Sequence, residues 1–542
     1  MSRATVVTKA GAALCATCML LLAGCGGSDK AATTKDGKPI VTVQVIKDSR
    51  MKKMTDQAWT KSLEKACGCS INWQEVGDPA WDQQKKASLA AGDVPDINIR
   101  GFGSGDMSEY GSLFLDLTPE LKNMPNVSKM FKEDPYSKAI STTTDGKILG
   151  VPGVAGAVYP RSSTHMFINK TWLDKLGLKV PTTWDELHDV LKAFKTQDPN
   201  GNGEADEIPM DFNSPGTGGF GLFQPNVLLA SEGITVPNGA LGMYAENGKV
   251  KNYLTDARYK KLIQYLHTLW SENLINPEAF THDWSKFINT TRGDGKTAKV
   301  GVTWMYTPEG TFGTENQDQY ITIPTLKASE NQSEKTVSPF NGDELAYMPD
   351  RVVVSAKVKN KDAALKIVDA LYSADLSVES RYGSFGEAVK KNGTDDYTII
   401  PKPENGDWQF QVSMGDRAPG WINDKMKLNL PSIHTAYHDV DGVYDEDYKN
   451  IDFNKDVLYA NMPMTSDQSK TLNANYTGIT QGAMSKFANW VTKGGVDDEW
   501  DTYVESLKKN KLDENIRIEQ QVYDSFKKNM RKMDVDMNNV AK

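Results

Sequence analysis

The chain has 542 residues, of which 39% are hydrophobic and 25% charged, an ordinary globular composition in a chain long enough for at least two hydrophobic cores. Its formal net charge is −9 and its pI is near 5.4, and acidic residues are spread along the whole sequence. Nucleic-acid binding requires concentrated Lys and Arg, so this charge argues against nucleic acid as a partner.

Residues 1–24 are predicted to form a signal peptide. Positive Arg3 and Lys9 precede an apolar stretch that is too short to cross a bilayer permanently. The stretch ends in Leu-Ala-Gly-Cys25, which resembles a lipobox, so we expect the thiol of Cys25 to carry a diacylglycerol. The alternative is an ordinary cleaved signal followed by an accidental cysteine. Acyl chains on Cys25 would anchor the protein without a spanning helix.

Residues 25–37 are predicted to form a lipidated, flexible tether, because they are polar and lack apolar periodicity. No later segment is apolar enough to predict a membrane-spanning helix. We therefore expect the folded body on the extracellular face of the cell membrane, held there by the lipid anchor.

The segment after the tether alternates between predicted strands and helices. We predict strands over 39–45, 70–76 and 94–99, and helices over 54–67 and 79–91. This alternation indicates an α/β fold with a parallel sheet and right-handed crossovers. Ligands of such sheets sit beyond the carboxyl ends of the strands, so the Gly-rich loop at 101–105 is a candidate wall of a binding site.

Further elements follow in the rest of the chain. We predict strands over 165–170, 299–304 and 350–355, an amphipathic helix over 362–373, and a mainly helical C-terminal part from Thr477. A helix over 171–177 should end at Gly177, and Thr182 or Thr183 should cap the next one.

Two cysteines, Cys67 and Cys69, remain once the signal peptide and Cys25 are set aside. A Cys-Gly-Cys pair can close only a small ring, so a labile disulfide and two free thiols are both open. The spacing fits neither a zinc site nor a redox Cys-x-x-Cys motif.

Four stretches resemble one family. Residues 169–187, which include Trp172, Pro181 and Trp184, are similar to a segment of the family 1 extracellular solute-binding proteins of ABC importers. Residues 85–97, 353–372 and 490–526 resemble further segments of that family in the same order. The loop at Asp198 is similar to the branch that contains alginate-binding proteins and many large lipoproteins.

The resemblance implies two α/β lobes joined by a hinge that closes on a ligand, as in periplasmic-binding-protein-like folds. The lobes should be interleaved in the chain. The N-lobe is expected from residues 38–155 plus 335–375, and the C-lobe from residues 156–334 plus 376–542.

The resemblance also implies a function. The expected protein is a monomeric substrate-binding lipoprotein that captures a carbohydrate, preferably an oligosaccharide, and delivers it intact to ABC permease subunits. Two alternatives stay open. One is a surface-anchored carbohydrate-active enzyme, and the other is a binding protein for a non-sugar solute such as a peptide or a phosphorylated polyol.

Catalytic motifs give no support to an enzyme. The chain lacks a His-Glu-x-x-His motif, a P-loop lysine and a Gly-x-Ser-x-Gly motif. His434 and His438 stand four residues apart, but Pro431 makes a helix there doubtful, so both are interpreted as surface residues. Carboxylate pairs are plentiful, so a glycosidase remains compatible with the sequence. We expect no catalytic residues.

Residues 198–207 are a candidate calcium loop. Oxygen donors alternate with glycine along this segment, which suits the several oxygen ligands that Ca²⁺ requires. The twelfth position is Pro209 instead of the glutamate of an EF-hand, and the resemblance implies Glu207 as the closing ligand. The alternative is a polar Asn-Gly turn. The expected ligands of this structural ion are Asp198, Asn200, Asn202, Glu204 (through its carbonyl), Asp206 and Glu207.

Aromatic side chains stack on sugar rings, while polar side chains bond the hydroxyls. Trp304 follows a strand where the family often has a stacking aromatic, and Trp421 lies in a loop-like stretch. Tyr159 and Arg161 follow a Gly-rich crossover and are expected to face the cleft. Core packing or an ordinary surface position is the alternative for every candidate. The further substrate-binding candidates are Phe102, Trp284, Tyr306, Asp343 and Trp408.

Overall fold

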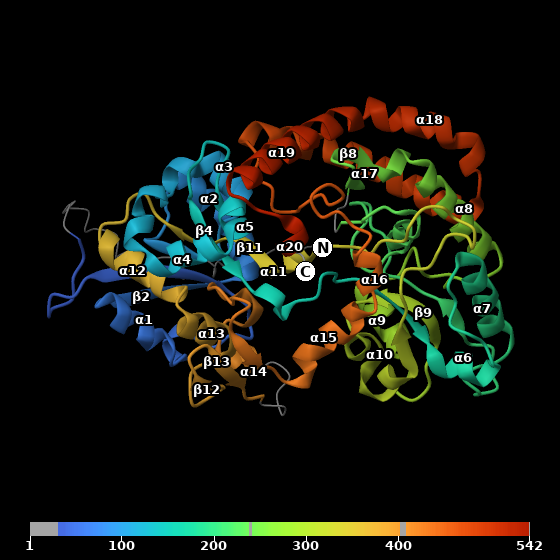
Figure 1. The fold of residues 1–542 in the computed structure, drawn as a ribbon, viewed down its shortest axis with the longest axis horizontal. Coiled ribbons are helices and arrows are strands. Elements are labelled where there is room, and N and C mark those ends of the chain that lie inside the picture. The colour runs from blue at the N-terminus through green and yellow to red at the C-terminus, as the bar shows by residue number, and fades with distance from the viewer. Residues whose placement is uncertain (1–30, 238–240, 402–407, 541–542) are drawn as a thin grey trace, which may run out of the picture.

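The computed structural model describes residues 31–237, 241–401 and 408–540, and the side chains of Ala157, Trp408, Gln409 and residues 432–436 are also left undescribed. The predicted signal peptide, Cys25 and residues 26–30 of the tether therefore lie outside the described residues. The described chain forms two α/β lobes side by side (Figure 1).

The first lobe is built on a five-stranded sheet with the order β2-β1-β3-β11-β4. Its parallel strands β1 (Ile40–Lys47), β2 (Ser70–Gly77) and β3 (Ile97–Ile99) confirm the predicted strands, and β11 (Tyr347–Val354) runs antiparallel to β3 and β4 (Gly150–Val154). Apolar side chains of α1 (Thr60–Cys67), α4 (Pro125–Glu133) and α12 (Lys361–Leu371) form one core with this sheet. A second core lies against α2 (Asp78–Ala91) and α3 (Ser104–Tyr110).

Local chemistry explains most of these boundaries. Gly92, with φ 65°, ends α2, since it adopts the left-handed conformation without a Cβ clash. The helix expected over 54–67 is broken, because the Met54 amide donates to Glu75 Oε1 at 2.9 Å and a 3₁₀ turn (Met54–Asp56) precedes α1. The expected Gly-rich loop is also shorter, since α3 already begins at Ser104.

The second lobe contains a four-stranded sheet with the order β10-β5-β9-β6. Its strands are β10 (Tyr320–Thr322), β5 (His165–Asn169), β9 (Val300–Met305) and β6 (Ile208–Met210). The surrounding helices are α6 (Lys170–Leu176), α7 (Trp184–Thr196), α8 (Ala257–Ser271), α9 (Trp284–Arg292) and α10 (Pro308–Asn316), and β7 (Met243–Glu246) and β8 (Lys249–Asn252) form a hairpin. Thr183 caps α7 by accepting from the Glu186 amide, as predicted.

A smaller sheet of β12 (Val389–Gly393), β13 (Asp396–Ile399) and β14 (Lys427–Asn429) packs with α13 (Ala374–Tyr382) beneath the first lobe, next to α14 (Trp408–Val412) (Figure 1). Met414, Ala418 and Trp421 of this segment enter the core of the first sheet. Val337 and Phe340, in contrast, belong to the core of the second lobe. Core packing thus assigns Val337 and Phe340 to the second lobe and Met414, Ala418 and Trp421 to the first, while the lobe boundaries at 335 and 375 stay a prediction.

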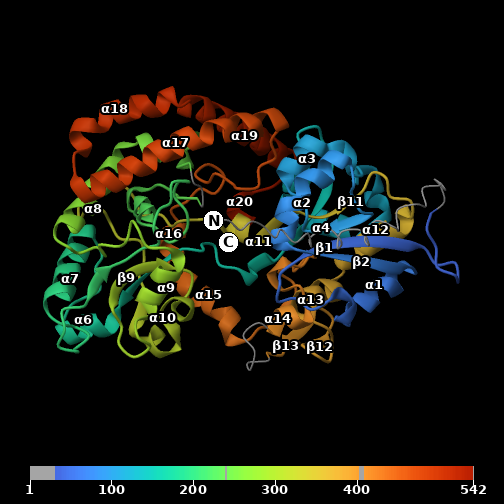
Figure 2. The same cartoon turned by 180° about the vertical axis from the view of Figure 1, so that it is seen from behind.

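The C-terminal helices join the two lobes on one side. Helices α17 (Ser466–Lys493), α18 (Val496–Lys509) and α19 (Leu512–Lys532) extend from the second lobe toward α3 and α5 (Pro135–Ser141), as both views show (Figures 1 and 2). Ser108 Oγ donates to the Met464 carbonyl at 2.8 Å, and the Tyr136 and Phe526 rings lie 6.1 Å apart. The lobes therefore share a contact outside the crossover segments.

Two remaining predictions concern single elements. Residues 432–442 form helix α15 (Ser432–Gly442), so the interpretation of a doubtful helix was wrong: Pro431 precedes the first turn, where proline is tolerated. Cys67 and Cys69 form a disulfide, and both side chains are buried. Within the described part of the chain, no helix has the length and apolarity needed to cross a membrane.

Candidate functional site

Three cavities lie next to one another around α11 (Gly342–Ala346), in the segment that leads from the second lobe back to the first. The largest has a volume of about 540 Å³ and is lined by both lobes, the crossover at 156–161 and α15. It contains three of the predicted binding residues, namely Tyr159, Arg161 and Asp343.

The second cavity, of about 240 Å³, lies at the carboxyl end of β3 and the start of β11. Arg100, Phe102, Tyr347 and Arg351 line it, so the predicted residue Phe102 also reaches a cavity. Phe102 is only 5% exposed and packs edge-on against Trp81 and Phe114, which makes it mainly a wall residue.

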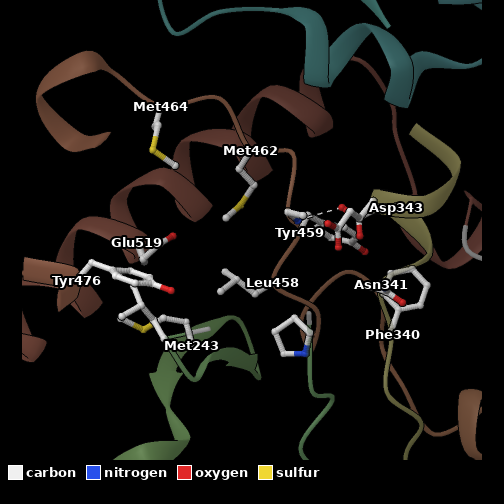
Figure 3. A pocket seen from close by; sticks show the side chains of 14 residues that line it. Met243, Phe340, Asn341, Asp343, Leu458, Tyr459, Met462, Met464, Tyr476 and Glu519 are labelled. Atoms are coloured by element: carbon white, nitrogen blue, oxygen red, sulfur yellow. Dashed lines mark hydrogen bonds between the residues drawn. The ribbon is translucent and has the colours of Figure 1, made fainter. Parts of the chain in front are cut away.

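The third cavity, of about 210 Å³, is lined by Met243, Met462, Met464 and Tyr476 together with the carboxyl group of Glu519 (Figure 3). It shares Asp343 with the largest cavity and Glu344 with the second. Residues of α11 therefore line all three cavities.

Arg161 is held rigidly at the edge of the largest cavity. Its Nε donates to Asp441 Oδ2 at 2.7 Å, its Nη2 donates to Asp445 at 2.6 Å, and its guanidinium lies 3.9 Å from the centre of the Tyr448 ring. Burial raises the pKa of Asp441, but hydrogen bonds and charge from His165 and Arg161 outweigh it and hold that pKa below its usual range. Arg161 is therefore fixed in place, and its positive charge is neutralised by Asp441 and Asp445.

Tyr159 connects the first crossover to the small sheet. Arg381 Nη2, from α13, donates to Tyr159 Oη at 2.7 Å and also contacts Asp416 at 3.1 Å. Burial raises the pKa of the Tyr159 hydroxyl, so the group stays neutral and available for hydrogen bonding. Burial raises the pKa of Tyr306 in the second lobe, and the nearby hydroxyl of Tyr437 and the charge of Asp416 add to the shift.

Asp343 is only 5% exposed and lies at the junction of the cavities. Its Oδ2 accepts from the Ala460 amide at 3.0 Å and from the Tyr136 hydroxyl at 3.3 Å. Burial raises its pKa to about 6. This carboxyl group can therefore act as acceptor or donor in mildly acidic solution.

A row of ion pairs at the edge of the first sheet escaped the sequence analysis. Arg417 bonds Asp78 and also Asp48, at 3.0 Å in the second case, and Arg100 bonds the other oxygen of Asp78. Asp48, Asp78 and Arg100 directly follow β1, β2 and β3, and this position at strand ends is the signal that could have found them. No sequence pattern links them to Arg417.

Several predicted binding residues do not reach these three cavities. Trp304 is 1% exposed in the second-lobe core and contributes only to a small gap of about 20 Å³, and Trp421 is 5% exposed in the first-lobe core. Trp284 is 47% exposed beside Phe223. Tyr306 is half-buried against Tyr437, and Trp408 begins α14, its side chain undescribed.

The candidate calcium loop folds around its own oxygens. Asp198 accepts from the amides of Gly201 and Gly203, and Asn200 Oδ1 accepts from the Asn202 amide at 3.0 Å. Lys299 pairs with Asp206 at 2.9 Å. Glu207 is 2% exposed, and its Oε1 has no hydrogen-bond partner.

The donor set of this loop includes amide and backbone oxygens. Among the described residues, no three or more His, Cys, Asp or Glu side chains cluster tightly enough to hold a metal by themselves. The buried, unpartnered oxygen of Glu207 nevertheless fits a hard cation that also takes carbonyl and amide ligands.

Comparison with known proteins gives a consistent result. Residues 44–376 match the family described as bacterial extracellular solute-binding protein. The chain is 28% identical over 549 residues to the fructooligosaccharide ABC transporter substrate-binding protein FusA of Streptococcus pneumoniae serotype 4, an alignment that covers 96% of this chain and 98% of FusA.

Two solved structures have similar folds. An HMO-binding, ABC-transporter-associated solute-binding protein from Bifidobacterium longum infantis is 40% identical, with a TM-score of 0.87 over 91% of this chain and 99% of that chain. An EF-hand mutant of FusA in complex with fructo-nystose is 25% identical, with a TM-score of 0.74 over 90% of this chain and 100% of that chain.

Proposed function

Because this chain belongs to the bacterial extracellular solute-binding proteins, we propose that it captures an oligosaccharide between its lobes and delivers it intact to an ABC permease. The observation that carries the proposal is the 540 Å³ cavity, to which both lobes and the crossovers between them contribute. A cavity of this kind changes shape when the lobes rotate, so ligand binding can be coupled to closure.

The residues around the cavities suit a polyhydroxylated ligand. Tyr159, Phe340 and Tyr347 offer aromatic faces in the largest cavity, and Asp343, Asp424 and His438 offer hydrogen-bonding groups. Aromatic faces contact the C–H surfaces of sugar rings, while polar groups fix the hydroxyls. The proposal is supported by relatives that carry fructooligosaccharide or HMO binding in their names.

Calorimetric titration of the lipid-free protein with neutral and acidic oligosaccharides, short peptides and polyol phosphates tests the proposal. We expect one class of oligosaccharide to bind and to raise the melting temperature. Binding of peptides or polyol phosphates in place of every sugar would establish the non-sugar alternative and refute the proposal.

The enzyme alternative is separated by a turnover assay. We expect labelled oligosaccharides to be recovered intact after prolonged incubation with the protein, since the carboxylates near Arg161 are occupied by its guanidinium. Release of shorter products at a rate proportional to protein concentration would instead establish a carbohydrate-active enzyme.

We also propose a structural calcium ion at residues 198–207. Side-chain oxygens of Asp198, Asn200, Asn202, Asp206 and Glu207 and the carbonyl of Glu204 would hold it, in agreement with the existence of an EF-hand in FusA. The bound ion would supply positive charge beside the buried carboxylate of Glu207 and so stabilise the loop.

The cellular arrangement follows from the N-terminal motif. We propose that a diacylglycerol on Cys25 holds a monomer at the extracellular face of the membrane, near its permease. Metabolic labelling with a fatty acid tests this assignment: wild-type protein should carry the label, and a Cys25→Ser variant should lose it and appear in the medium.

A further inference from the structure

Strand β11 contains a bulge at its cavity-facing end. Its register against β4 shifts between Met348 and Val352, and Asp350 has φ 51°, a left-handed conformation that is uncommon outside glycine. Gly150 lies opposite, where a Cβ would approach the Asp350 Cα to 2.9 Å, so only glycine allows this close approach. The backbone is thus arranged to interrupt the ladder at one place.

The bulge places Arg351 in the wall of the 240 Å³ cavity. Bulges redirect side chains and occur often beside binding sites, so we interpret this one as the feature that directs Arg351 toward the cavity. Asp350 itself is held in place, because Ser104 Oγ donates to its Oδ2 at 2.8 Å. Arg351 is therefore presented from a fixed backbone and not from a mobile loop.

The Arg351 side chain has no hydrogen bond or ion pair within the described structure, and its Nε is buried without an acceptor. Burial lowers its pKa to about 10, and the neighbouring cations Arg100 and Arg381 contribute to the same shift. Arg100 bonds Asp78, and Arg381 bonds Tyr159 and Asp416. Asp78 and Asp416 are thus paired with arginines other than Arg351.

Other charged groups lie near Arg351. Among the described residues, Arg417 pairs with Asp48 and Asp78, so the carboxylates that follow β1 and β2 are paired with an arginine other than Arg351. Glu344 lines the same cavity but is exposed to solvent, and Asp350 accepts from Ser104.

An uncompensated, largely desolvated guanidinium destabilises a fold, so its presence at a cavity indicates a functional role. A neutral sugar hydroxyl can accept a hydrogen bond from arginine, but it does not neutralise the positive charge of the guanidinium. A carboxylate matches the planar guanidinium in geometry and in sign.

We propose that Arg351 receives the carboxylate of an acidic oligosaccharide, such as one that contains a uronic acid, with Arg100 beside it and Phe102 and Tyr347 as apolar walls. This inference rests on the proposed oligosaccharide-binding function and narrows it to carboxylated sugars.

The test uses the whole lipid-free protein and oligogalacturonates of one chain length, each compared with its carboxyl methyl ester. We expect the free acids to bind at least about tenfold more tightly than the esters, and high salt to weaken only the acids. The same comparison on sialylated trisaccharides and their methyl esters covers a second source of sugar carboxylate. Sulfated oligosaccharides that bind more tightly than the carboxylated ones would overturn the carboxylate assignment.

Variants separate recognition from folding. Arg351→Met should weaken binding of the acids about tenfold or more and leave the esters unchanged, and Arg351→Lys should restore part of the affinity. Arg517→Met removes the same charge from the exposed surface of α19 and should change neither. Since Arg351 is unpaired, Arg351→Met should keep or raise the melting temperature; a lower value would indicate a structural role.

The outcomes are distinguishable. If esters and acids bind equally and Arg351→Met weakens both, the carboxylate inference fails while the oligosaccharide function stands. If no oligosaccharide of either kind binds, both proposals fail.

Discussion

The rings of Tyr306 and Tyr437 lie 4.7 Å apart at an interplanar angle of 41°. Tyr306 follows β9 of the second lobe, and Tyr437 belongs to α15, the helix that leads the chain from the small sheet into that lobe. The Tyr306 carbonyl also accepts a hydrogen bond from Nδ1 of buried His165, at 3.0 Å. Tyr437 immediately precedes His438, which lines the largest cavity, so this pair is an aromatic surface next to that cavity.

Alanine at Tyr306 or Tyr437 should weaken oligosaccharide binding by about 0.5–1.5 kcal/mol, which corresponds to roughly 2- to 12-fold, because a stacking face is lost. Calorimetric titration measures the change. Trp284→Ala removes an exposed aromatic side chain that packs beside Phe223, and it serves as the matched control. Unchanged affinity in both tyrosine variants would remove this surface from the site.

Trp304 and Trp421 should behave as core residues. Trp304→Ala should destabilise the protein by about 3–5 kcal/mol, because a fully buried indole leaves a cavity behind. The milder Trp304→Phe and Trp421→Phe variants should lower the melting temperature and leave the affinity of the folded protein unchanged. A weaker ligand affinity at an unchanged melting temperature would show instead that these residues contact the ligand.

Removal of calcium should destabilise the second lobe. At a free Ca²⁺ concentration about 100 times the Kd, binding contributes about 2.7 kcal/mol, so a chelator should lower the melting temperature by several degrees. Glu207→Gln should abolish this difference, since it neutralises the buried carboxylate. Glu204→Gln changes a residue expected to bind through its carbonyl, and it should retain the chelator effect. Identical melting curves with and without chelator would refute the calcium site.

Stability should depend on the protonation of Glu519 in the methionine-lined cavity (Figure 3). Burial raises its pKa from 4.5 to about 7. The folded state therefore holds the proton more tightly than the unfolded state, and the stabilisation present below about pH 4.5 is lost as the pH rises to about 7. The shift corresponds to at most about 3 kcal/mol, and partial exposure reduces it.

Glu519→Gln should consequently raise the free energy of unfolding at about pH 8 and change it little at about pH 5. Urea unfolding of wild type and variant at the two pH values measures this difference. Asp524→Asn removes an exposed carboxylate from the same helix and should show no such pH dependence. An equal effect of Glu519→Gln at both pH values would show that burial does not perturb this carboxyl.

Local elements were predictable because their causes are local. The alternating β-branched residues of β1, the Thr183 cap and the glycine ends at Gly92 and Gly177 each involve neighbours only a few positions apart. The oxygen donors of residues 198–207 are equally close in sequence, and so the candidate calcium loop could be proposed from spacing alone.

The binding surface was predictable only in part. Tyr159 and Arg161 were predicted to face the cleft because they follow a Gly-rich crossover, and they line the largest cavity together with the further candidate Asp343. Trp304 and Trp421 are buried in the cores of the two lobes, because neither a strand end nor a loop-like stretch determines which side chains the fold covers.

The sequence by itself thus determined the α/β elements, the family and the chemistry available to the chain. The tertiary structure alone decided which charges meet: Arg417 bonds Asp48 and Asp78 from more than 300 positions away, and Arg351 is left without a carboxylate by a bulge that depends on Gly150. Ion pairing and burial depend on distance in space, and only the packed fold sets that distance.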